Sequence, residues 1–180
     1  MTLWVALPRA INLGSHNKVP MPALRDVLTA AGCTDVRTYV QSGNIVFRTP
    51  LRSAAAVRKL VVGILAREFT VTTSAAVRTA AQIDAVIAAN PFPDATAERP
   101  KVVQVTFLDA QPIPAAAAAL RELPVATERT ELIGAELYVD YGESIHASKL
   151  TPDRLRRVLR VDGTARNWTT VSAIAALLPG

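Results

Sequence analysis

The order of apolar patterns along the first 78 residues is the feature that most constrains the fold. Residues 2–8 predict a strand, and a helical pattern runs from Pro22 to Gly32. Two strand-like runs follow, Val36 to Gln41 and Asn44 to Arg48. The Ser42-Gly43 pair between these runs is typical of a hairpin turn.

A second helix and a fourth strand complete this pattern. Five apolar residues share one face of the helix: Val57, Leu60, Val61, Ile64 and Leu65. Residues 69–78 are rich in Thr and Val, which favours a strand. The resulting order βαββαβ is the ferredoxin-like arrangement, so we expect an α+β fold whose first subdomain occupies residues 1–78.

Residues 79–180 predict a second α+β subdomain that has an antiparallel sheet and ends in two helices. Its first helix carries Ile83, Val86 and Ile87 and stops at Asn90-Pro91, and residues 93–101 are linker-like. The remaining elements are expected in this order: a strand over Val102 to Leu108, an Ala-rich helix over 112–122, a hairpin over 127–141 turning at Gly134-Ala135, a helix starting near Pro152 with Thr151 as its N-cap, and a helix starting near Asn167. No internal repeat is visible at the level of sequence.

Composition and charge exclude several classes of protein. The one cysteine, Cys33, rules out an internal disulfide and a multi-cysteine zinc site, and we interpret it as a buried small side chain. The longest apolar run, near Leu60 to Ala66, is far below the roughly 20 residues of a membrane helix. Residues 1–14 lack the pattern of a signal peptide. We therefore expect a cytoplasmic protein that makes no use of a membrane.

The net charge of +5 rests mainly on arginine, since sixteen of the twenty basic residues are Arg. Together with abundant Ala, this composition is typical of a GC-rich bacterial genome. Between Lys149 and Arg166 there are six basic residues and two acidic ones, a local charge of +4. This segment is either a solvated helix face or a surface for phosphate groups.

Polar residues gather in two loops that the predicted topology brings together. In a right-handed split βαβ unit the first and second strands run parallel, so the loop after the first strand and the turn after the second lie at the same end of the sheet. The loop contributes Arg9, Asn12, Ser15, His16, Asn17 and Lys18, and the turn contributes Gln41, Ser42 and Asn44.

Two further polar groups lie near the end of the chain. Around the predicted start of the last helix, Thr164 or Asn167 can act as a cap, Arg166 can face an anion at the helix N-terminus, and Trp168 can stack on a planar ligand. The alternative is that Asn167 only caps, Trp168 belongs to the core and Arg166 pairs with a carboxylate. Ser148-Lys149 is either a nucleophile and base pair, an anion contact, or solvated.

Several ordered motifs closely resemble the bacterial domain-of-unknown-function family 1697. They are residues 9–18 (RAINLGSHNK), 37–47 (RTYVQSGNIVF), 90–93 (NPFP), 105–108 (VTFL), 148–150 (SKL) and 164–171 (TARNWTTV). The resemblance implies a two-part α+β fold with a ferredoxin-like first half, and it implies no activity, substrate or cofactor. This chain departs from the family pattern in the first loop, where Ala10 and Ser15-His16 replace glycine or lysine positions.

The leading hypothesis for function is a binding protein for a phosphate-bearing or other anionic ligand, either a nucleotide or a nucleic acid. The candidate binding residues are Arg9, Asn12, Lys18, Gln41, Ser42, Asn44, Ser148, Lys149, Arg166, Asn167 and Trp168. One alternative is a small metal-independent enzyme using Lys149, Ser148, Ser42 or His16. The other is that the polar loops are purely structural. No motif indicates a metal or a cofactor, and the sequence identifies neither catalytic residues nor protein partners.

Overall fold

The chain forms two compact units in the computed structural model, which describes residues 1–125 and 127–178. The first unit comprises Met1–Ala85 together with the chain from Ala173 onward, and the second comprises Val86–Ser172. The division falls inside helix α3 (Ala80–Ala88), whereas the sequence predicted a boundary after residue 78. The return of the chain to the first unit was not indicated by the sequence.

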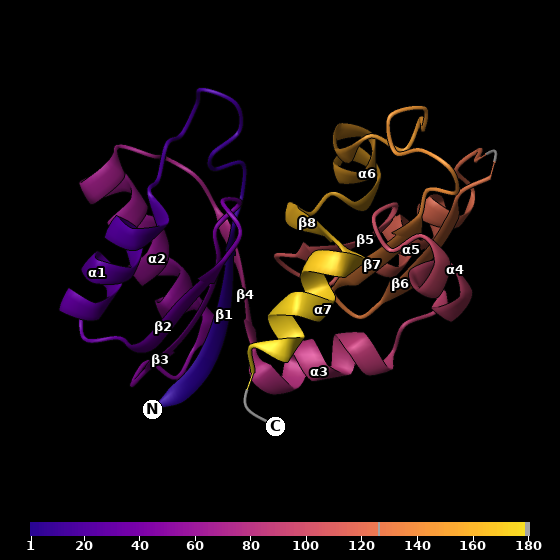
Figure 1. Ribbon diagram of the computed structural model, residues 1–180. Coiled ribbons are helices and arrows are strands. Elements are labelled where there is room, and N and C mark those ends of the chain that lie inside the picture. Colours follow the sequence, from indigo (N-terminus) through magenta and orange to yellow (C-terminus); the bar gives the residue numbers. More distant parts are fainter. Residues whose placement is uncertain (126, 179–180) are drawn as a thin grey trace. The chain divides into compact units, whose positions relative to one another are not determined.

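The first unit has the predicted βαββαβ order. Its elements are β1 (Thr2–Pro8), α1 (Met21–Ala30), β2 (Thr34–Tyr39), β3 (Asn44–Thr49), α2 (Ala54–Phe69) and β4 (Ala75–Thr79). The strands form an antiparallel sheet in the order β2-β3-β1-β4, and α1 and α2 pack on the same face of it (Figure 1). This is the ferredoxin-like topology, so β1 and β2 run parallel with β3 between them.

Alternating residues of the strands make the core beneath these helices. Trp4, Ala6, Ile45 and Phe47 pack with buried apolar residues of α1 and α2, including Leu24. Phe47 is completely buried there, and burying such a side chain contributes about 1.5–3 kcal/mol. Because it is completely buried, Phe47 has no exposed face on which a nucleic-acid base could stack.

The strand predicted over residues 69–78 is shorter in the structure, and the prediction is wrong for the first residues of that range. Phe69 is the last residue of α2, and Thr70 closes the helix in a left-handed conformation with φ 56°. The Val71 amide then donates to the Leu65 carbonyl at 3.0 Å. These helix-capping bonds hold the backbone of the Thr-rich segment away from the sheet, so β4 begins only at Ala75.

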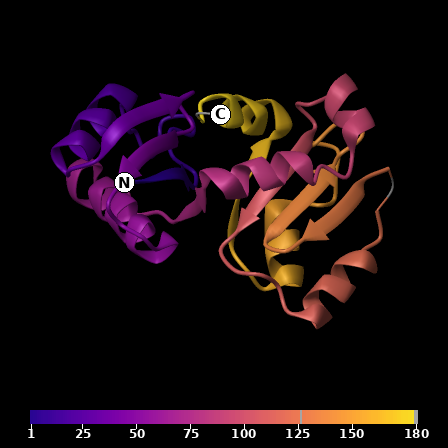
Figure 2. The same cartoon turned by 90° about the horizontal axis from the view of Figure 1, so that it is seen from below.

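The second unit repeats the topology of the first. It consists of β5 (Val103–Leu108), α5 (Pro114–Arg121), β6 (Arg129–Ile133), β7 (Glu136–Asp140), α6 (Pro152–Leu159) and β8 (Gly163–Asn167). Its antiparallel sheet has the order β6-β7-β5-β8, and α5 and α6 cover one face (Figures 1 and 2). Both halves are therefore βαββαβ units, a repeat that the sequence does not display.

Each unit continues from its fourth strand directly into a helix. Helix α3 follows β4, and α7 (Trp168–Ala176) follows β8. At the start of α3, Thr79 and Gln82 exchange hydrogen bonds in a capping box. At the start of α7, the Asn167 side chain accepts from the Thr170 amide at 2.9 Å, which confirms Asn167 as the cap.

Two sequence predictions in the second half are corrected. Residues 93–101 are not a linker, because Pro93–Glu98 form the short helix α4. The side-chain amide of Asn90 donates to the Thr96 hydroxyl of this helix at 2.8 Å. The sequence predicted no strand between the last two helices, whereas Gly163–Asn167 pair with β5 as strand β8. This strand has few apolar residues, so only its pairing with β5 identifies it. Within the described residues, no helix has the length and apolar character needed to cross a membrane.

Candidate functional site

The loop after β1 and the turn after β2 meet, as the topology predicts. We call these segments, residues 9–19 and 40–44, the loop platform. The Asn12 side chain joins them: its Nδ2 donates to the Gln41 carbonyl at 2.7 Å and to the Val19 carbonyl at 2.9 Å, and its Oδ1 accepts from the Val19 amide at 2.7 Å. One side chain therefore closes the loop and fastens it to the turn.

Other polar side chains of the loop platform bind backbone within it. Asn17 donates to the Ala10 carbonyl at 3.0 Å, and the Lys18 ammonium donates to the Gly14 carbonyl at 2.5 Å. Asn44, fully buried, donates to the Tyr39 carbonyl at 2.9 Å. Asn12 and Asn44 thus hold the fold of the loops, as the structural interpretation of these residues requires.

The backbone of the loop platform is unusually strained. Ala10, Asn12, Asn17 and Val40 all have φ between 51° and 53°, in the left-handed region. This conformation costs about 1–2 kcal/mol for most residues with a side chain, Asn tolerates it better, and it is rare for a β-branched residue such as Val40. Gly43 also has positive φ, and a Cβ atom there would overlap Ile11. Packing and side-chain bonds therefore impose one conformation on both segments.

The exposed chemistry of the loop platform is cationic and polar. Lys18 and Gln41 are exposed, Arg9 and Ser42 are partly buried, and the two segments contain no Asp or Glu. The first unit as a whole has ten basic and four acidic residues, a net charge of +6, whereas the second has ten basic and eleven acidic residues, a net charge of −1. The excess charge of the chain therefore belongs to the first unit.

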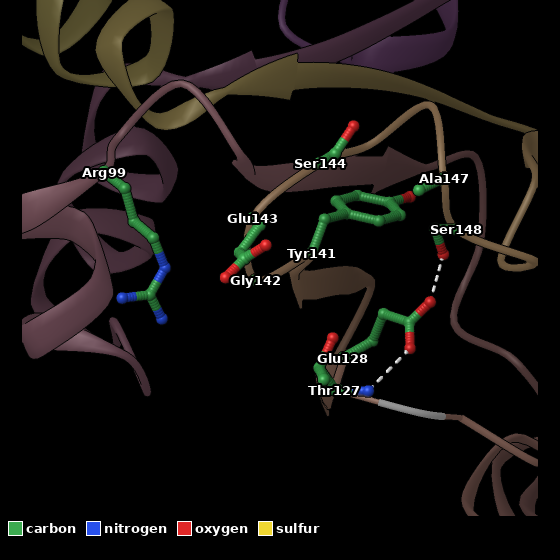
Figure 3. Close-up of a pocket in the computed structure, with 9 residues that line it drawn as sticks. All are labelled: Arg99, Thr127, Glu128, Tyr141, Gly142, Glu143, Ser144, Ala147 and Ser148. Atoms are coloured by element: carbon green, nitrogen blue, oxygen red, sulfur yellow. Dashed lines mark hydrogen bonds between the residues drawn. The ribbon is translucent and has the colours of Figure 1, made fainter.

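The five remaining candidate residues lie in the second unit, at two places along its chain. Ser148 and the exposed Lys149 precede α6, and Arg166, Asn167 and Trp168 lie where β8 continues into α7. The Ser148 hydroxyl donates to the Glu128 carboxylate and accepts from the Leu150 amide at 3.0 Å (Figure 3). The acceptor of its proton is thus a carboxylate rather than the Lys149 amine.

The three residues at the β8–α7 junction are buried or partly buried. Trp168 is only 9% exposed, which leaves little ring surface for stacking. Arg166 donates to the Ala165 carbonyl at 2.9 Å, and burial lowers the pKa of its guanidinium to about 10, so it is charged at neutral pH. Asn167 is occupied as a helix cap.

A pocket of about 640 Å³ lies beside Ser148 in the second unit (Figure 3). Its polar lining includes Arg99, Glu128, Tyr141, Glu143, Ser144 and Ser148, and Thr127, Gly142 and Ala147 complete it. This volume is in the range of small-molecule sites, about 300–1,000 Å³. The sequence indicated only Ser148 among these residues, because the others come from the end of α4, a hairpin and a loop with no recognisable motif.

Arg99 enters the pocket wall from an ion-pair network. Its NH2 lies 2.8 Å from Asp140, a carboxylate only 1% exposed, which also lies 2.8 Å from Arg129. Arg129 extends the network to Asp94 at 2.9 Å and lies over the Phe92 ring. The network fixes α4 against β6 and β7. Arg99 Nε is buried and has no hydrogen-bond partner among the described residues.

Burial raises the pKa of two tyrosines in the second unit, Tyr138 and Tyr141. Burial, with a smaller contribution from the charge of Glu128, raises the pKa of Tyr141 to about 12. Its hydroxyl donates to the Leu150 carbonyl at 3.3 Å, which fixes the loop that carries Ser148. Within the described part of the chain, no three His, Cys, Asp or Glu side chains gather as ligands for a metal ion.

Comparison with known proteins gives a family and a fold. The model of DUF1697, a family described as proteins of unknown function, matches residues 1–138. A solved structure of a conserved bacterial protein, SP0830 from Streptococcus pneumoniae, is similar with a TM-score of 0.77 and 22% sequence identity, over 99% of each chain. No curated protein matches the sequence. The structural similarity supports the α+β fold, and the family match confirms the resemblance recognised from the sequence motifs.

Proposed function

Since the chain belongs to the DUF1697 family of unknown function, we propose a function from its own residues: the protein binds a phosphate-bearing or other anionic ligand, a nucleotide or a nucleic acid, at the loop platform. The observation that carries the proposal is the hydrogen bond from Asn12 to the Gln41 carbonyl at 2.7 Å, which fixes a cationic loop and a polar turn in one place. A site held in one conformation before binding loses less entropy when the ligand arrives.

The distribution of charge supports an anion as the ligand. Arg9 and Lys18 lie in segments without a carboxylate, on a unit of net charge +6. Such a field raises the local concentration of anions and their rate of association. Exposed Gln41 adds an amide that can donate to phosphate oxygens.

The structural alternative makes a different prediction for the same residues. If the polar loops only maintain the fold, Asn12 and Asn44 matter because they bind backbone, Lys18 matters only through its bond to the Gly14 carbonyl within the loop, and neither Lys18 nor Gln41 affects the binding of a ligand. The binding proposal requires the opposite for Lys18 and Gln41. Substitutions of Lys18 and Gln41 therefore distinguish the binding proposal from the structural alternative, and they leave the hydrogen bonds of Asn12 in place.

The proposal takes the protein to act in the bacterial cytoplasm. Its one cysteine, Cys33, is buried, and burial raises the pKa of the thiol above its usual range, partly offset by a hydrogen bond with Thr49. A protonated, enclosed thiol suits a structural role in a reducing compartment.

The experiment is a thermal-shift screen of nucleotides, sugar phosphates, tRNA and short oligonucleotides at low and moderate salt. A ligand at a hundredfold excess over its Kd stabilises the native state by about 2.7 kcal/mol, which is readily detected. We expect a hit whose shift is lost in Lys18→Ala and reduced in Gln41→Ala. Arg52→Ala is the matched control, because Arg52 is an exposed cation of the same unit outside the loop platform.

The salt dependence of the hit distinguishes the two kinds of anion. A nucleic acid bound through several phosphates loses affinity steeply as salt rises, and a mononucleotide much less. No shift with any anion, or an equal loss of the shift in Lys18→Ala and Arg52→Ala, would contradict binding at the loop platform.

A further inference from the structure

The loop between β1 and α1 contains a tight turn at residues 13–16, which we call the loop tip. Leu13 and His16 face each other across it as an antiparallel bridge, and the His16 amide donates to the Leu13 carbonyl at 3.0 Å. Residues paired in this way have Cβ atoms about 4.5–5.5 Å apart on the same face. The loop tip therefore presents an aliphatic side chain and an imidazole ring side by side.

Both side chains of this pair are open to solvent. Leu13 is 60% exposed, and His16 is exposed as well. Figure 1 shows the loop reaching past the end of the sheet of the first unit. A single exposed apolar side chain is ordinary on a protein surface, but this one is held beside a ring in a loop of fixed conformation. Such a surface matches the flat face of a nucleobase, which stacks on histidine and on aromatic rings.

The Lys18 ammonium is fixed next to the exposed pair. It donates to the Gly14 carbonyl at 2.5 Å, and Gly14 lies in the turn between Leu13 and His16. This bond uses one of the three ammonium hydrogens, which leaves two for a ligand. The loop platform contains no Asp or Glu, so no carboxylate in it competes with a phosphate for the ammonium. The loop tip thus combines a stacking surface with an adjacent cation.

We propose that the ligand of the loop platform is a mononucleotide, whose base stacks on Leu13 and His16 and whose phosphate is bound by Lys18. This inference rests on the proposed function and narrows it to one of the two kinds of anion. A nucleic-acid strand needs rings and cations repeated along a path. The loop platform has one aromatic ring, that of His16, and two cations, Arg9 and Lys18, which suits a single nucleotide.

The test compares adenosine monophosphate with two probes that each lack one of its groups. Ribose 5-phosphate lacks the base, and adenosine lacks the phosphate. Binding to the whole protein is followed in two-dimensional amide NMR spectra through the signals of Gly14, Ser15 and His16. We expect adenosine monophosphate to shift these signals with a Kd of about 1 mM or tighter. The other two probes should each bind about tenfold more weakly, because one loses the stacking contact and the other the charge-assisted hydrogen bonds.

Substitutions at the loop tip locate the base. Leu13→Ala and His16→Ala should each weaken the binding of adenosine monophosphate about threefold to tenfold and leave the affinity for ribose 5-phosphate unchanged. This selectivity distinguishes a lost stacking contact from a loosened loop, which would weaken the binding of both probes. Ile113→Ala and His146→Ala are the matched controls, because both residues are exposed in the second unit, and neither substitution should affect either probe.

The outcomes separate this inference from anion binding in general. Equal affinity for adenosine monophosphate and ribose 5-phosphate, lost in Lys18→Ala, would overturn the base contact and keep the anion site. Loop-tip signals that move with none of the probes would overturn the mononucleotide, and the polyanions of the thermal-shift screen would then decide the anion site by themselves. Shifts caused by vesicles of phosphatidylserine and phosphatidylcholine, but not by adenosine monophosphate, would also overturn the inference, in favour of a lipid surface.

Discussion

The Asn12 side chain donates to the backbone carbonyl of Gln41 across a separation of 29 residues in sequence, and the N···O distance is 2.7 Å. The same side chain closes its own loop through both backbone groups of Val19. One amide therefore links two segments that the sheet topology brings to the same end.

Asn12→Ala should lower the free energy of unfolding by about 1–3 kcal/mol, because Val19 and Gln41 lose their partners in a partly buried setting. Chemical denaturation measures the loss. Asn17→Ala is the control, since exposed Asn17 makes one bond, to Ala10, and should change stability by well under half as much. Equal effects of the two substitutions would show that Asn12 does not join the loop to the turn.

Gly43→Ala and Gly134→Ala form a matched pair that separates backbone strain from overlap. Both glycines have positive φ, 73° and 61°, but a Cβ at Gly43 overlaps Ile11, whereas one at Gly134 meets Glu136 only at 3.9 Å. Gly134→Ala should cost about 1 kcal/mol for the backbone alone. Gly43→Ala should cost about 1–3 kcal/mol more, by urea denaturation. Equal losses would mean that the turn does not pack on Ile11.

Asp140 should make the protein sensitive to acid. Burial raises the pKa of this carboxyl, but hydrogen bonds from Arg99, the Gly142 amide and Arg129 outweigh it, so the pKa lies below 3.8. A lowered pKa stabilises the fold above pH 3.8, and this contribution is lost as the pH falls through the folded-state value.

Asp140→Asn should remove this contribution and lower stability at pH 7 by about 1–3 kcal/mol, with a smaller difference from the parent protein at pH 3. Unfolding curves at both pH values measure it. The control is Asp153→Asn, whose exposed ion pair with Arg156 at 3.4 Å should contribute below about 1 kcal/mol. A difference that stays constant between pH 7 and pH 3 would contradict the role of the Asp140 charge.

Tyr141 should make the protein sensitive to base. Its pKa is raised from 10.0 to about 12 by burial, so the folded state resists loss of the phenolic proton. The contribution of Tyr141 to the free energy of unfolding is therefore fully present below pH 10 and is lost as the pH rises toward 12. The slope approaches about 1.4 kcal/mol per pH unit for one such group. Tyr138, raised to about 12 by the same cause, adds to this slope.

Tyr141→Phe should reduce that slope, which denaturation at a series of pH values between 10 and 12 measures. Tyr39→Phe serves as the control, because Tyr39 lies in the first unit and is only partly buried. If the variant and the parent lose stability equally over this range, Tyr141 is not protected from titration in the folded state.

The first βαββαβ unit could be predicted from the sequence, because apolar periodicity and turn residues are local signals. The sequence also placed Asn12 next to Gln41, since strand order alone brings those loops to one end. Elements that form only through strand pairing or packing could not be predicted from the sequence. Strand β8 has few apolar residues, yet it forms because β5 offers it an edge.

The burial of each candidate side chain depends on the packing of the whole unit, which no local pattern in the sequence shows. The sequence offered Trp168 as a residue that could stack on a planar ligand. In the fold its side chain is only 9% exposed, and Asn167 beside it caps α7. The pocket around Ser148 is lined by residues from the end of α4, a hairpin and a loop. No sequence motif with a fixed spacing could therefore indicate it. The repeated topology of the two units is also invisible in sequence, because a sheet fixes the pattern of burial and pairing and leaves the identity of most side chains open.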